Sequence, residues 1–257
     1  MSGPFGVVGP RAALALDGVS GLVAIVGGGG KSSLMFALAD ALPGRVVMTT
    51  TTRIFASQME LADEVVALSD PGWEARLEAA GSHASNLLVV GHVEGDRAVG
   101  VPPELPAQWL SRAAVDWVVI EADGSRMLPV KAPAEHEPVV PVEADLLVAV
   151  AGIDALDHSI ADIAHRPGRV AAVAGLALTD HLTPEALARV LAAPEGGLKN
   201  LPAGARAALL LNKVETPAQR EAARRVAQAA LEMPQVERVA IGALRAGPEE
   251  PWEVWRR

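Results

Sequence analysis

The stretch LVAIVGGGGKSS, residues 22–33, decides the fold. It starts with five apolar residues, continues through four glycines and ends in a Lys-Ser pair, after which apolar residues recur at helical spacing up to residue 42. A buried strand, a glycine turn and a helix that begins at Lys-Ser form a phosphate-binding arrangement. We expect phosphate contacts from Gly27, Gly28, Gly29, Gly30, Lys31, Ser32 and Ser33.

The glycine spacing matches a particular form of phosphate loop. In the common form the first glycine would stand where this chain has Ile25. The shorter Gly-Gly-x-Gly-Lys-Ser form, used by ATPases and GTPases of the signal-recognition and partitioning class, fits residues 27–32. Lys31 would supply a mobile positive charge, and the Ser32 hydroxyl is a suitable Mg²⁺ ligand. The predicted cofactors are therefore ATP or GTP, with Mg²⁺.

The rest of the chain alternates strand-length apolar runs with helical patterns. Strands are predicted at residues 22–26, 45–49, 86–91, 117–121, 145–151, 207–212 and 238–242. Thr183-Pro184 and Thr216-Pro217 predict helix starts, because a capping Thr precedes a first-turn Pro in both. This alternation is typical of an α/β chain: a three-layer, P-loop NTPase-like fold with a mostly parallel central sheet flanked by helices. We predict a single nucleotide-binding domain over residues 1–257, with a helical insertion at about 153–200.

Composition excludes several classes of function. The 257 residues carry 22 Lys and Arg against 31 Asp and Glu, a net charge of −9, and half of them are hydrophobic. Disorder is excluded by the apolar content, and nucleic acid and anionic membranes are disfavoured by the acidic balance. The absence of Cys excludes disulfides and a sulfur nucleophile. Without a secretory signal or a run long enough to span a bilayer, we expect a cytoplasmic protein.

Two carboxylates follow a hydrophobic strand at residues 117–121. Glu121 and Asp123 are two residues apart, so they project to the same side of an extended chain. With Ser32, they would hold Mg²⁺ directly or through water, and Asp123 would orient an attacking water or a substrate. Gly124 completes an acidic-x-x-Gly element whose glycine amide would sense a γ-phosphate. Two solvated carboxylates at a strand end are the simpler alternative.

A second apolar strand, residues 207–212, ends in Asn212, Lys213 and, after one residue, Glu215. In GTPases an Asn-Lys-x-Asp element reads the guanine base. Glu215 is one methylene longer than that Asp, so base contact is predicted while guanine selectivity stays open. A plain strand-to-helix turn is the alternative interpretation.

Four threonines and Arg53 close the strand at residues 45–49. Doubly wound sheets bind ligands at the carboxyl ends of their strands. A hydroxyl such as that of Thr50 would reach a metal or a γ-phosphate, and Arg53 would neutralise transferring charge. The expected catalytic residues are thus Lys31, Arg53, Glu121 and Asp123. A run of β-branched residues that merely finishes a strand is the alternative.

Together these motifs resemble those of the selenium-dependent hydroxylase accessory family (YqeC-like selenium cofactor biosynthesis proteins). The shared elements are VGGGGKS, TTTTRIF, IEADGSR, the block KAPAEHEP at residues 131–138, and HRP at residues 165–167. The resemblance covers residues 20 to about 215, and the KAPAEHEP block is its most specific part. It implies a P-loop protein that binds ATP or GTP and helps selenium-dependent molybdenum hydroxylases to mature. Family members often carry Thr after the loop lysine, where this chain has Ser32 and Ser33.

The family-specific block concentrates polar groups in a Pro-rich loop. His136, between two acidic residues, is a candidate proton shuttle or anchor for an intermediate. Arg126 and Lys131 would hold an anionic substrate, and His165-Arg166 would add an anion contact or start a helix. A structural salt-bridge cluster is the alternative. The candidate substrate or partner residues are Arg126, Lys131, Glu135, His136, Glu137, His165 and Arg166.

Three functions fit these motifs. The first is a Mg²⁺-dependent nucleoside triphosphatase that assists hydroxylase maturation. The second is a small-molecule kinase or other phosphoryl transferase in molybdenum or selenium cofactor metabolism, although the sequence shows no Arg-rich lid. The third is a non-catalytic nucleotide switch or adaptor that docks on a hydroxylase. The expected partners are a nucleotide and a molybdenum hydroxylase or its cofactor precursor, and a homodimer formed across bound nucleotides stays open.

Overall fold

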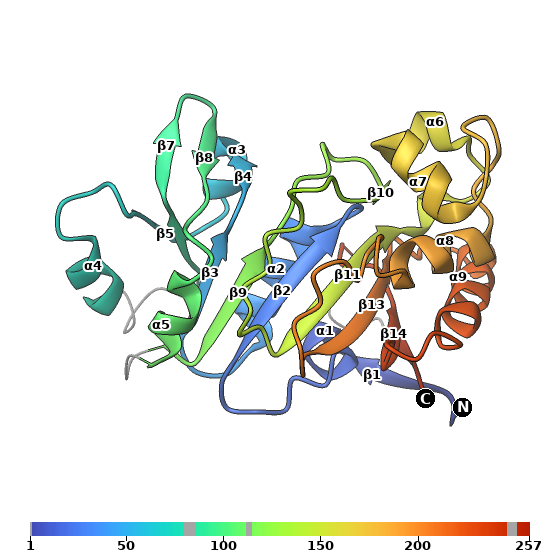
Figure 1. Cartoon of the computed structure of the whole chain (residues 1–257). Helices are drawn as coiled ribbons and strands as arrows, with labels where there is room; N and C mark the ends of the chain where they lie inside the picture. The colour runs from blue at the N-terminus through green and yellow to red at the C-terminus, as the bar shows by residue number, and fades with distance from the viewer. Residues whose placement is uncertain (1, 80–85, 112–114, 246–250) are drawn as a thin grey trace.

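A ten-stranded sheet runs through the centre of the molecule in the order β1-β15-β14-β13-β11-β2-β9-β3-β6-β5 (Figure 1). The computed structural model describes residues 2–79, 86–111, 115–245 and 251–257. The strands from β14 to β5 are parallel to one another, whereas β15 and β1 add an antiparallel edge next to β14. The strands of this sheet are β1 (Ser2–Val8), β2 (Gly21–Gly27), β3 (Val46–Thr50), β5 (Glu64–Ala67), β6 (Leu87–Val90), β9 (Trp117–Glu121), β11 (Leu146–Gly152), β13 (Arg206–Asn212), β14 (Arg238–Ile241) and β15 (Pro251–Arg256).

Each strand predicted from an apolar run is present in this sheet, with its ends shifted by no more than a residue or so. The α/β fold with a mostly parallel sheet between helices is confirmed. Strands β1, β5 and β15 were not predicted. Two small sheets were also missed: β10 (Val130–Lys131) with β12 (Ala164–His165), and the antiparallel sheet β4-β8-β7, formed by Arg53–Phe55, Arg97–Val99 and His92–Glu94.

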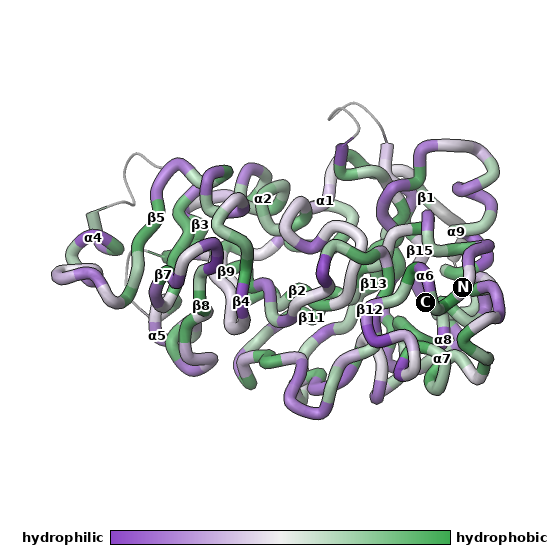
Figure 2. Tube along the Cα trace, turned by 90° about the horizontal axis from the view of Figure 1, so that it is seen from above, coloured by the Kyte–Doolittle hydropathy of each residue, from purple (hydrophilic) through white to green (hydrophobic). Residues whose placement is uncertain are grey.

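Helices cover both faces of the central sheet and make three layers (Figure 1). Alternate residues of β2 show this: Leu22 and Val26 belong to the core under α8 and α9, whereas Val23 and Ile25 belong to the core under α1 and α2. Figure 2 shows hydrophobic residues along strands such as β3 and β13 and hydrophilic residues at many surface turns. The helices are α1 (Gly9–Ala13), α2 (Lys31–Ala41), α3 (Ala56–Met59), α4 (Trp73–Ala79), α5 (Leu105–Ser111), α6 (Ile160–Ile163), α7 (Pro167–Ala174), α8 (Pro184–Ala192), α9 (Pro217–Ala230) and the 3₁₀ turn η2 (Ile153–Ala155).

The two predicted helix starts are confirmed. The Thr183 hydroxyl accepts a hydrogen bond from the Ala186 N–H at the start of α8. Thr216 forms a capping box with Gln219 at the start of α9. Such caps satisfy N–H groups that have no acceptor within the helix. Residues 153–200, where a helical insertion was expected, contain η2, α6, α7 and α8 together with β12.

Parallel pairing brings the carboxyl ends of the central strands to one edge of the sheet. The glycine loop follows β2, and β2 lies between β9 and β11. The chain moves from β2 to β3 on one side and later crosses to β11 on the other. Ligands of open α/β sheets bind at such a switch in direction, beyond the carboxyl ends of the strands. Within the described residues, no helix has the length and apolar character needed to cross a membrane.

Candidate phosphate-binding site

Glycine is required in the loop between β2 and α2 because neighbouring backbone lies within contact distance. Gly29 has φ +72°, and a Cβ there would overlap the backbone of Gly152 in β11. Gly30 has φ +137°, and a Cβ there would overlap the side-chain amide of Asn212. Only glycine adopts this conformation without strain and without these overlaps.

Hydrogen bonds to the rest of the protein fix the path of this loop. The Gly27 N–H donates to both carboxylate oxygens of Asp123, at 3.1 Å each. The N–H groups of Gly28 and Gly29 donate to the carbonyls of Val150 (2.9 Å) and Leu128 (3.1 Å). Three of the four glycine N–H groups are therefore already bonded within the protein, and the phosphate contacts of these glycines stay predictions. A cavity next to the loop is lined by Gly29, Gly30 and the first residues of α2. The N–H groups of these first helix residues have no acceptor within the helix and can bind an anion.

Lys31 is the first residue of α2 and is almost fully buried. Its Nζ donates to the Gly27 carbonyl (2.9 Å) and lies 3.4 Å from a Glu121 oxygen and 3.5 Å from an Asp123 oxygen. Burial lowers the pKa of a lysine, but the two carboxylates outweigh it and hold the pKa of Lys31 above its usual value. Lys31 is therefore charged at neutral pH, as a phosphate ligand has to be.

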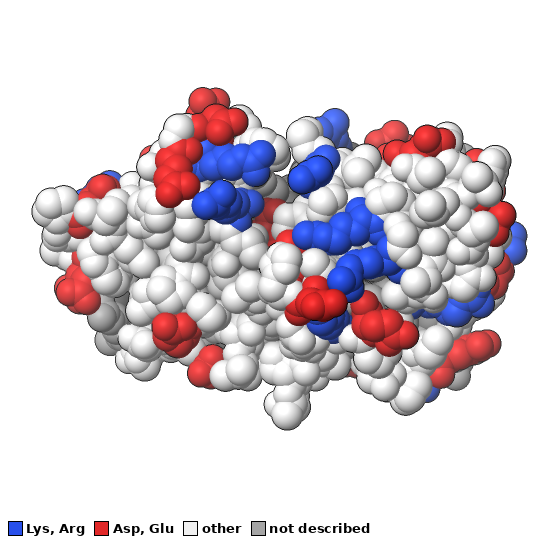
Figure 3. Space-filling model, turned by 45° about the horizontal axis from the view of Figure 1, so that its top comes forward, with Lys and Arg blue, Asp and Glu red and all other residues white. Residues whose placement is uncertain are grey.

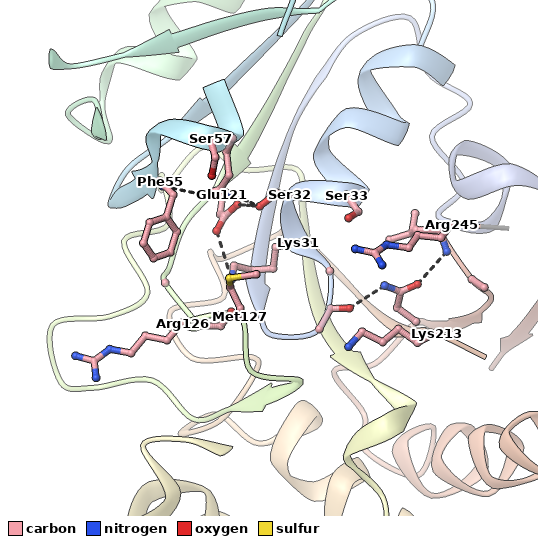
Figure 4. A pocket seen from close by; sticks show the side chains of 18 of the residues that line it. Lys31, Ser32, Ser33, Phe55, Ser57, Glu121, Arg126, Met127, Lys213 and Arg245 are labelled. Carbon is pink, nitrogen blue, oxygen red and sulfur yellow. Dashed lines mark hydrogen bonds and ion pairs between the residues drawn. The ribbon is translucent and has the colours of Figure 1, made fainter. Parts of the chain in front are cut away.

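Ser32 and Glu121 lie side by side at the cavity wall, as Figure 4 shows. The Ser32 hydroxyl donates to the Glu121 carboxylate at 2.7 Å, and the Gln58 amide donates to the same hydroxyl. Mg²⁺ prefers oxygen ligands such as a hydroxyl and a carboxylate. It usually keeps several bound waters, so one or two protein ligands are enough to hold it. The residues present therefore fit a magnesium ion next to the loop. Ser33 also lines the cavity, on the exposed side of the helix start.

Asp123 bonds to the loop but is not part of the cavity lining. Only 2% of it is exposed, and besides Gly27 and Lys31 it pairs with Lys131, whose Nζ is 2.9 Å from its carboxylate. Of the two carboxylates expected to act together, Glu121 lines the cavity and Asp123 holds the loop, while both lie within 3.5 Å of Lys31 Nζ. A role for Asp123 at the nucleophile or the metal stays a prediction.

The family-specific block forms a buried network of charges behind the loop. Lys131 Nζ lies 2.8 Å from Glu137 and donates to the Gly124 carbonyl at 2.7 Å. Arg166 donates two hydrogen bonds to Glu137, at 2.7 and 3.0 Å. Burial raises the pKa of Glu137, but Arg166 and Lys131 outweigh it and lower that pKa to about 2. Pairing of β10 with β12 places Lys131 beside His165 and so brings the two separate family motifs together.

Of the remaining residues of these motifs, Glu135, His136 and His165 lie outside the cavity lining. Glu135 and His136 have side chains that are 94% and 78% exposed. His165 is half-buried, and burial followed by the positive charges of Arg166, Lys131 and Arg126 lowers its pKa to about 4. His165 is therefore neutral at pH 7. Arg126 does line the cavity, in a left-handed conformation with φ 51°.

The threonines at the end of β3 bond to the protein's own backbone. Thr49, Thr50 and Thr51 donate their hydroxyl hydrogens to the carbonyls of Val89, Glu121 and Val139. Thr50 is completely buried, so its hydroxyl holds β3 to β9. Arg53 lines the cavity, as does Gly124.

The element predicted to contact a base, Asn212-Lys213-x-Glu215, lines another part of the cavity. The Asn212 Nδ2 donates to the Gly29 carbonyl (2.7 Å), and its Oδ1 accepts from the Leu244 N–H (3.0 Å). This amide ties the loop to the segment after β14. Lys213 Nζ pairs with Asp154 at 2.6 Å. Asn212, Lys213 and Glu215 all line the cavity.

The cavity has a volume of about 530 Å³ and a strongly cationic lining. Figure 3 shows Lys and Arg side chains on both sides of a hollow. The lining cations are Lys31, Arg53, Arg97, Arg126, Lys213 and Arg245, and the lining carboxylates are Glu121 and Glu215. For a chain of net charge −9, this concentration of positive charge indicates an anionic ligand.

Sequence reasoning missed several lining residues: Phe55, Gln58, Arg97, Met127, Leu244 and Arg245. The sequence around Arg97 could have predicted a β-hairpin, because Gly95-Asp96 lies between two short runs in which apolar and polar residues alternate. Gln58 had no such sequence signal, because only tertiary contact places its amide on Ser32.

Comparison with known proteins agrees with the extent of these motifs. A family model described as "YqeC protein" matches residues 23–168, a range that holds the loop, the carboxylate strand and the KAPAEHEP and HRP motifs. The chain is also 34% identical over 199 residues, 75% of each chain, to "Uncharacterized protein YqeC" of Escherichia coli (strain K12). The family match ends before Asn212 and Glu215. On both grounds, this chain belongs to the YqeC family.

Proposed function

We propose that this protein binds a nucleoside triphosphate with Mg²⁺ in the cationic cavity and hydrolyses it. The observation that carries the proposal is the Ser32 hydroxyl, 2.7 Å from Glu121 and next to the buried, charged Lys31 at a helix start. The further proposal, that hydrolysis assists the maturation of selenium-dependent molybdenum hydroxylases, rests on the motif resemblance alone.

The strand order supports one orientation of the nucleotide. Phosphates would lie at Lys31 and the start of α2, beyond β2, where a helix N-terminus favours negative charge. The base would lie beyond β13, beside Asn212, Lys213 and Glu215. The Asn212 amide has two N–H groups and donates one to Gly29, so the second is a donor for the base.

The metal would be held by Ser32 and Glu121, directly or through water. Bound there, Mg²⁺ would neutralise phosphate charge and orient the terminal phosphate. Lys31 would stabilise the charge that develops in the transition state, since its Nζ is already confined beside the loop. Asp123 would act on Lys31 and the Gly27 N–H as a positioning residue. Arg53 would add positive charge from the cavity wall.

Calorimetry with ATP and GTP, each with and without Mg²⁺, tests the proposal. We expect tight binding of one or both nucleotides to the wild type, strong loss in Lys31→Ala, and loss of the Mg²⁺ dependence in Glu121→Gln. Glu215→Ala, at the base end, should change the preference between ATP and GTP and leave the Mg²⁺ dependence intact. If neither nucleotide binds a protein that is folded by circular dichroism, nucleotide function is refuted.

A small-molecule phosphoryl transferase is the second candidate, because the cavity carries Arg53, Arg97 and Arg126 where the sequence alone showed no Arg-rich lid. Turnover that requires an added acceptor would favour this candidate. Turnover in water alone would favour the triphosphatase.

A further inference from the structure

The cavity lining extends across the sheet beyond the residues assigned to the nucleotide. The base-reading end lies beyond β13, and the strands β11, β2, β9 and β3 follow in that order across the sheet. At about 4.8 Å between strands, β13 and β3 are about 19 Å apart. A base beyond β13 and a phosphate contact at Lys31 beyond β2 leave most of the lining near β3 and β4 without an assigned ligand. This part of the lining, toward β3 and β4, is the far half of the cavity.

The far half is built by the small antiparallel sheet. Arg53 and Phe55 are two apart in β4 and therefore share a face, and Phe55 pairs directly with Arg97 of β8. Between them, Ile54 and Ala98 are buried in the core and fix which face of this sheet is turned outward. The three outward residues all line the cavity.

Positive charge in this half is largely uncompensated. The Arg97 guanidinium lies over the Phe55 ring, 4.6 Å from its centroid, which orders it while its N–H edge can still bind an oxyanion. Among the residues that the structure describes, Arg53 has one ion pair, with Glu94 at 3.5 Å, in which both side chains are more than half exposed. Such a pair contributes little and does not hold the guanidinium in place.

Arg126 approaches the same half from the loop after β9. Arg126 and Met127 both have positive φ, 51° and 63°, which is costly for residues other than glycine. Met127 is 85% exposed, an unusual position for a large apolar side chain. In Figure 4, Phe55 and Arg126 lie on one side of Lys31, and Lys213 and Arg245 lie on the other.

We infer that Arg53, Phe55, Arg97 and Arg126 form a subsite, the arginine subsite, for a second ligand: a small organic anion. Its phosphate or carboxylate group binds the guanidinium groups, which suit planar oxyanions. Its apolar part packs on Phe55 and the neighbouring Met127. The inference deepens the proposed function, and rests on it for placing the terminal phosphate of the nucleotide beside this subsite.

Phenyl phosphate is a suitable probe, and calorimetry on four proteins locates its binding. Wild type and Lys31→Ala should bind it alike, whereas Arg97→Gln/Arg126→Gln should lose at least about tenfold in affinity, because charged hydrogen bonds are removed. Arg76→Gln/Arg220→Gln, which removes the same charge outside the cavity lining, should bind as the wild type does. Loss in Lys31→Ala with retention in Arg97→Gln/Arg126→Gln would overturn the inference.

Two further measurements complete the test. Arg97→Lys/Arg126→Lys should recover part of the affinity, which separates lost charge from lost folding. Inorganic phosphate should bind more weakly than phenyl phosphate, and equal affinity would overturn the organic part of the assignment. ATP and GTP binding should survive in Arg97→Gln/Arg126→Gln. A protein that binds phenyl phosphate through the arginines but binds no nucleotide would refute the proposed function and leave the subsite standing.

Discussion

Replacing Lys131 by Met removes one charge from the centre of the buried network behind the loop. Lys131 Nζ lies 2.9 Å from Asp123 and 2.8 Å from Glu137, and donates to the Gly124 carbonyl at 2.7 Å. Only 1% of the lysine side chain is exposed. Met fills most of the same volume, so the substitution changes charge and hydrogen bonding more than packing.

The expected loss of unfolding free energy in Lys131→Met depends on the carboxylates that stay buried after the lysine charge is removed. Asp123, with 2% of its side chain exposed, would keep Lys31 at 3.5 Å as its cationic partner. At an effective dielectric of about 20, a pair at 2.9 Å attracts by about 6 kcal/mol before desolvation is counted. Removing one partner of a buried pair costs about 3–5 kcal/mol net, because the other charge loses its compensation. A domain is stable by only about 5–15 kcal/mol, so Lys131→Met should lose a large part of its stability.

Urea unfolding followed by tryptophan fluorescence measures the loss, since Trp109 and Trp117 are buried in the core. Lys213→Met is the matched control: its pair with Asp154 is just as short, at 2.6 Å, but about 40% of each side chain is exposed. That control should lose no more than about 1 kcal/mol. A loss under about 1 kcal/mol in Lys131→Met would refute the reasoning.

A double variant adds a second criterion. Asp123→Asn with Lys131→Met removes both charges of the pair, so it should cost less than the two single substitutions added together. Simple additivity would show that the two groups do not compensate each other. Either the single or the double measurement can therefore contradict the picture of a coupled network.

Three further predictions follow from single positions. Gly29→Ala should lose about 1–2 kcal/mol from its left-handed φ alone, and more from overlap with β11, whereas Gly168→Ala, with nothing near its Cβ, should lose none in thermal unfolding. The unfolding free energy of the wild type should fall between about pH 4.5 and 2, because the Glu137 carboxyl, with its lowered pKa, stabilises the fold only while it is ionised. In Glu137→Gln this fall should be smaller, and the same pH dependence in both proteins would contradict the prediction. The NMR signals of the His165 ring should titrate with a midpoint near pH 4. The fold should lose stability as the pH falls from about 6.5 toward 4, because the histidine of the unfolded state binds a proton at higher pH than that of the folded state. A midpoint near 6.5 would contradict the effect of burial and of the neighbouring cations on this pKa.

The sequence predicted the parts of the fold that depend on local pattern. Apolar runs locate the central parallel strands, and Thr-Pro pairs locate the starts of α8 and α9. Both signals are local, because hydrophobic periodicity and helix capping depend on residues that are close together in the sequence. The β4-β8-β7 sheet and the β1-β15 edge were not predicted, because the pairing of strands that are far apart in the sequence gives little local sequence signal.

The candidate site divides in the same way. Lys31, Ser32 and Glu121 were found because a glycine loop and a strand end are local features, and the structure brings the three together. The threonines of β3 could not be sorted by pattern, because whether a hydroxyl bonds to a ligand or to a carbonyl depends on tertiary contacts. The pairing of Lys131 with Asp123 likewise depends on how the intervening loop returns to the strand.

The hydrogen bonds of the glycine loop have a consequence for how the protein tolerates mutation. Gly28 and Gly29 donate to main-chain carbonyls, of Val150 and Leu128, which no side-chain replacement removes. Gly27 alone donates to a side chain, that of Asp123. Substitutions at positions 128 and 150 therefore leave these two loop hydrogen bonds in place, although Val150 is also a fully buried core residue. Almost any exchange at Asp123 removes a loop contact and a charge together. Sensitivity to substitution is concentrated at a residue outside the lining of the cationic cavity.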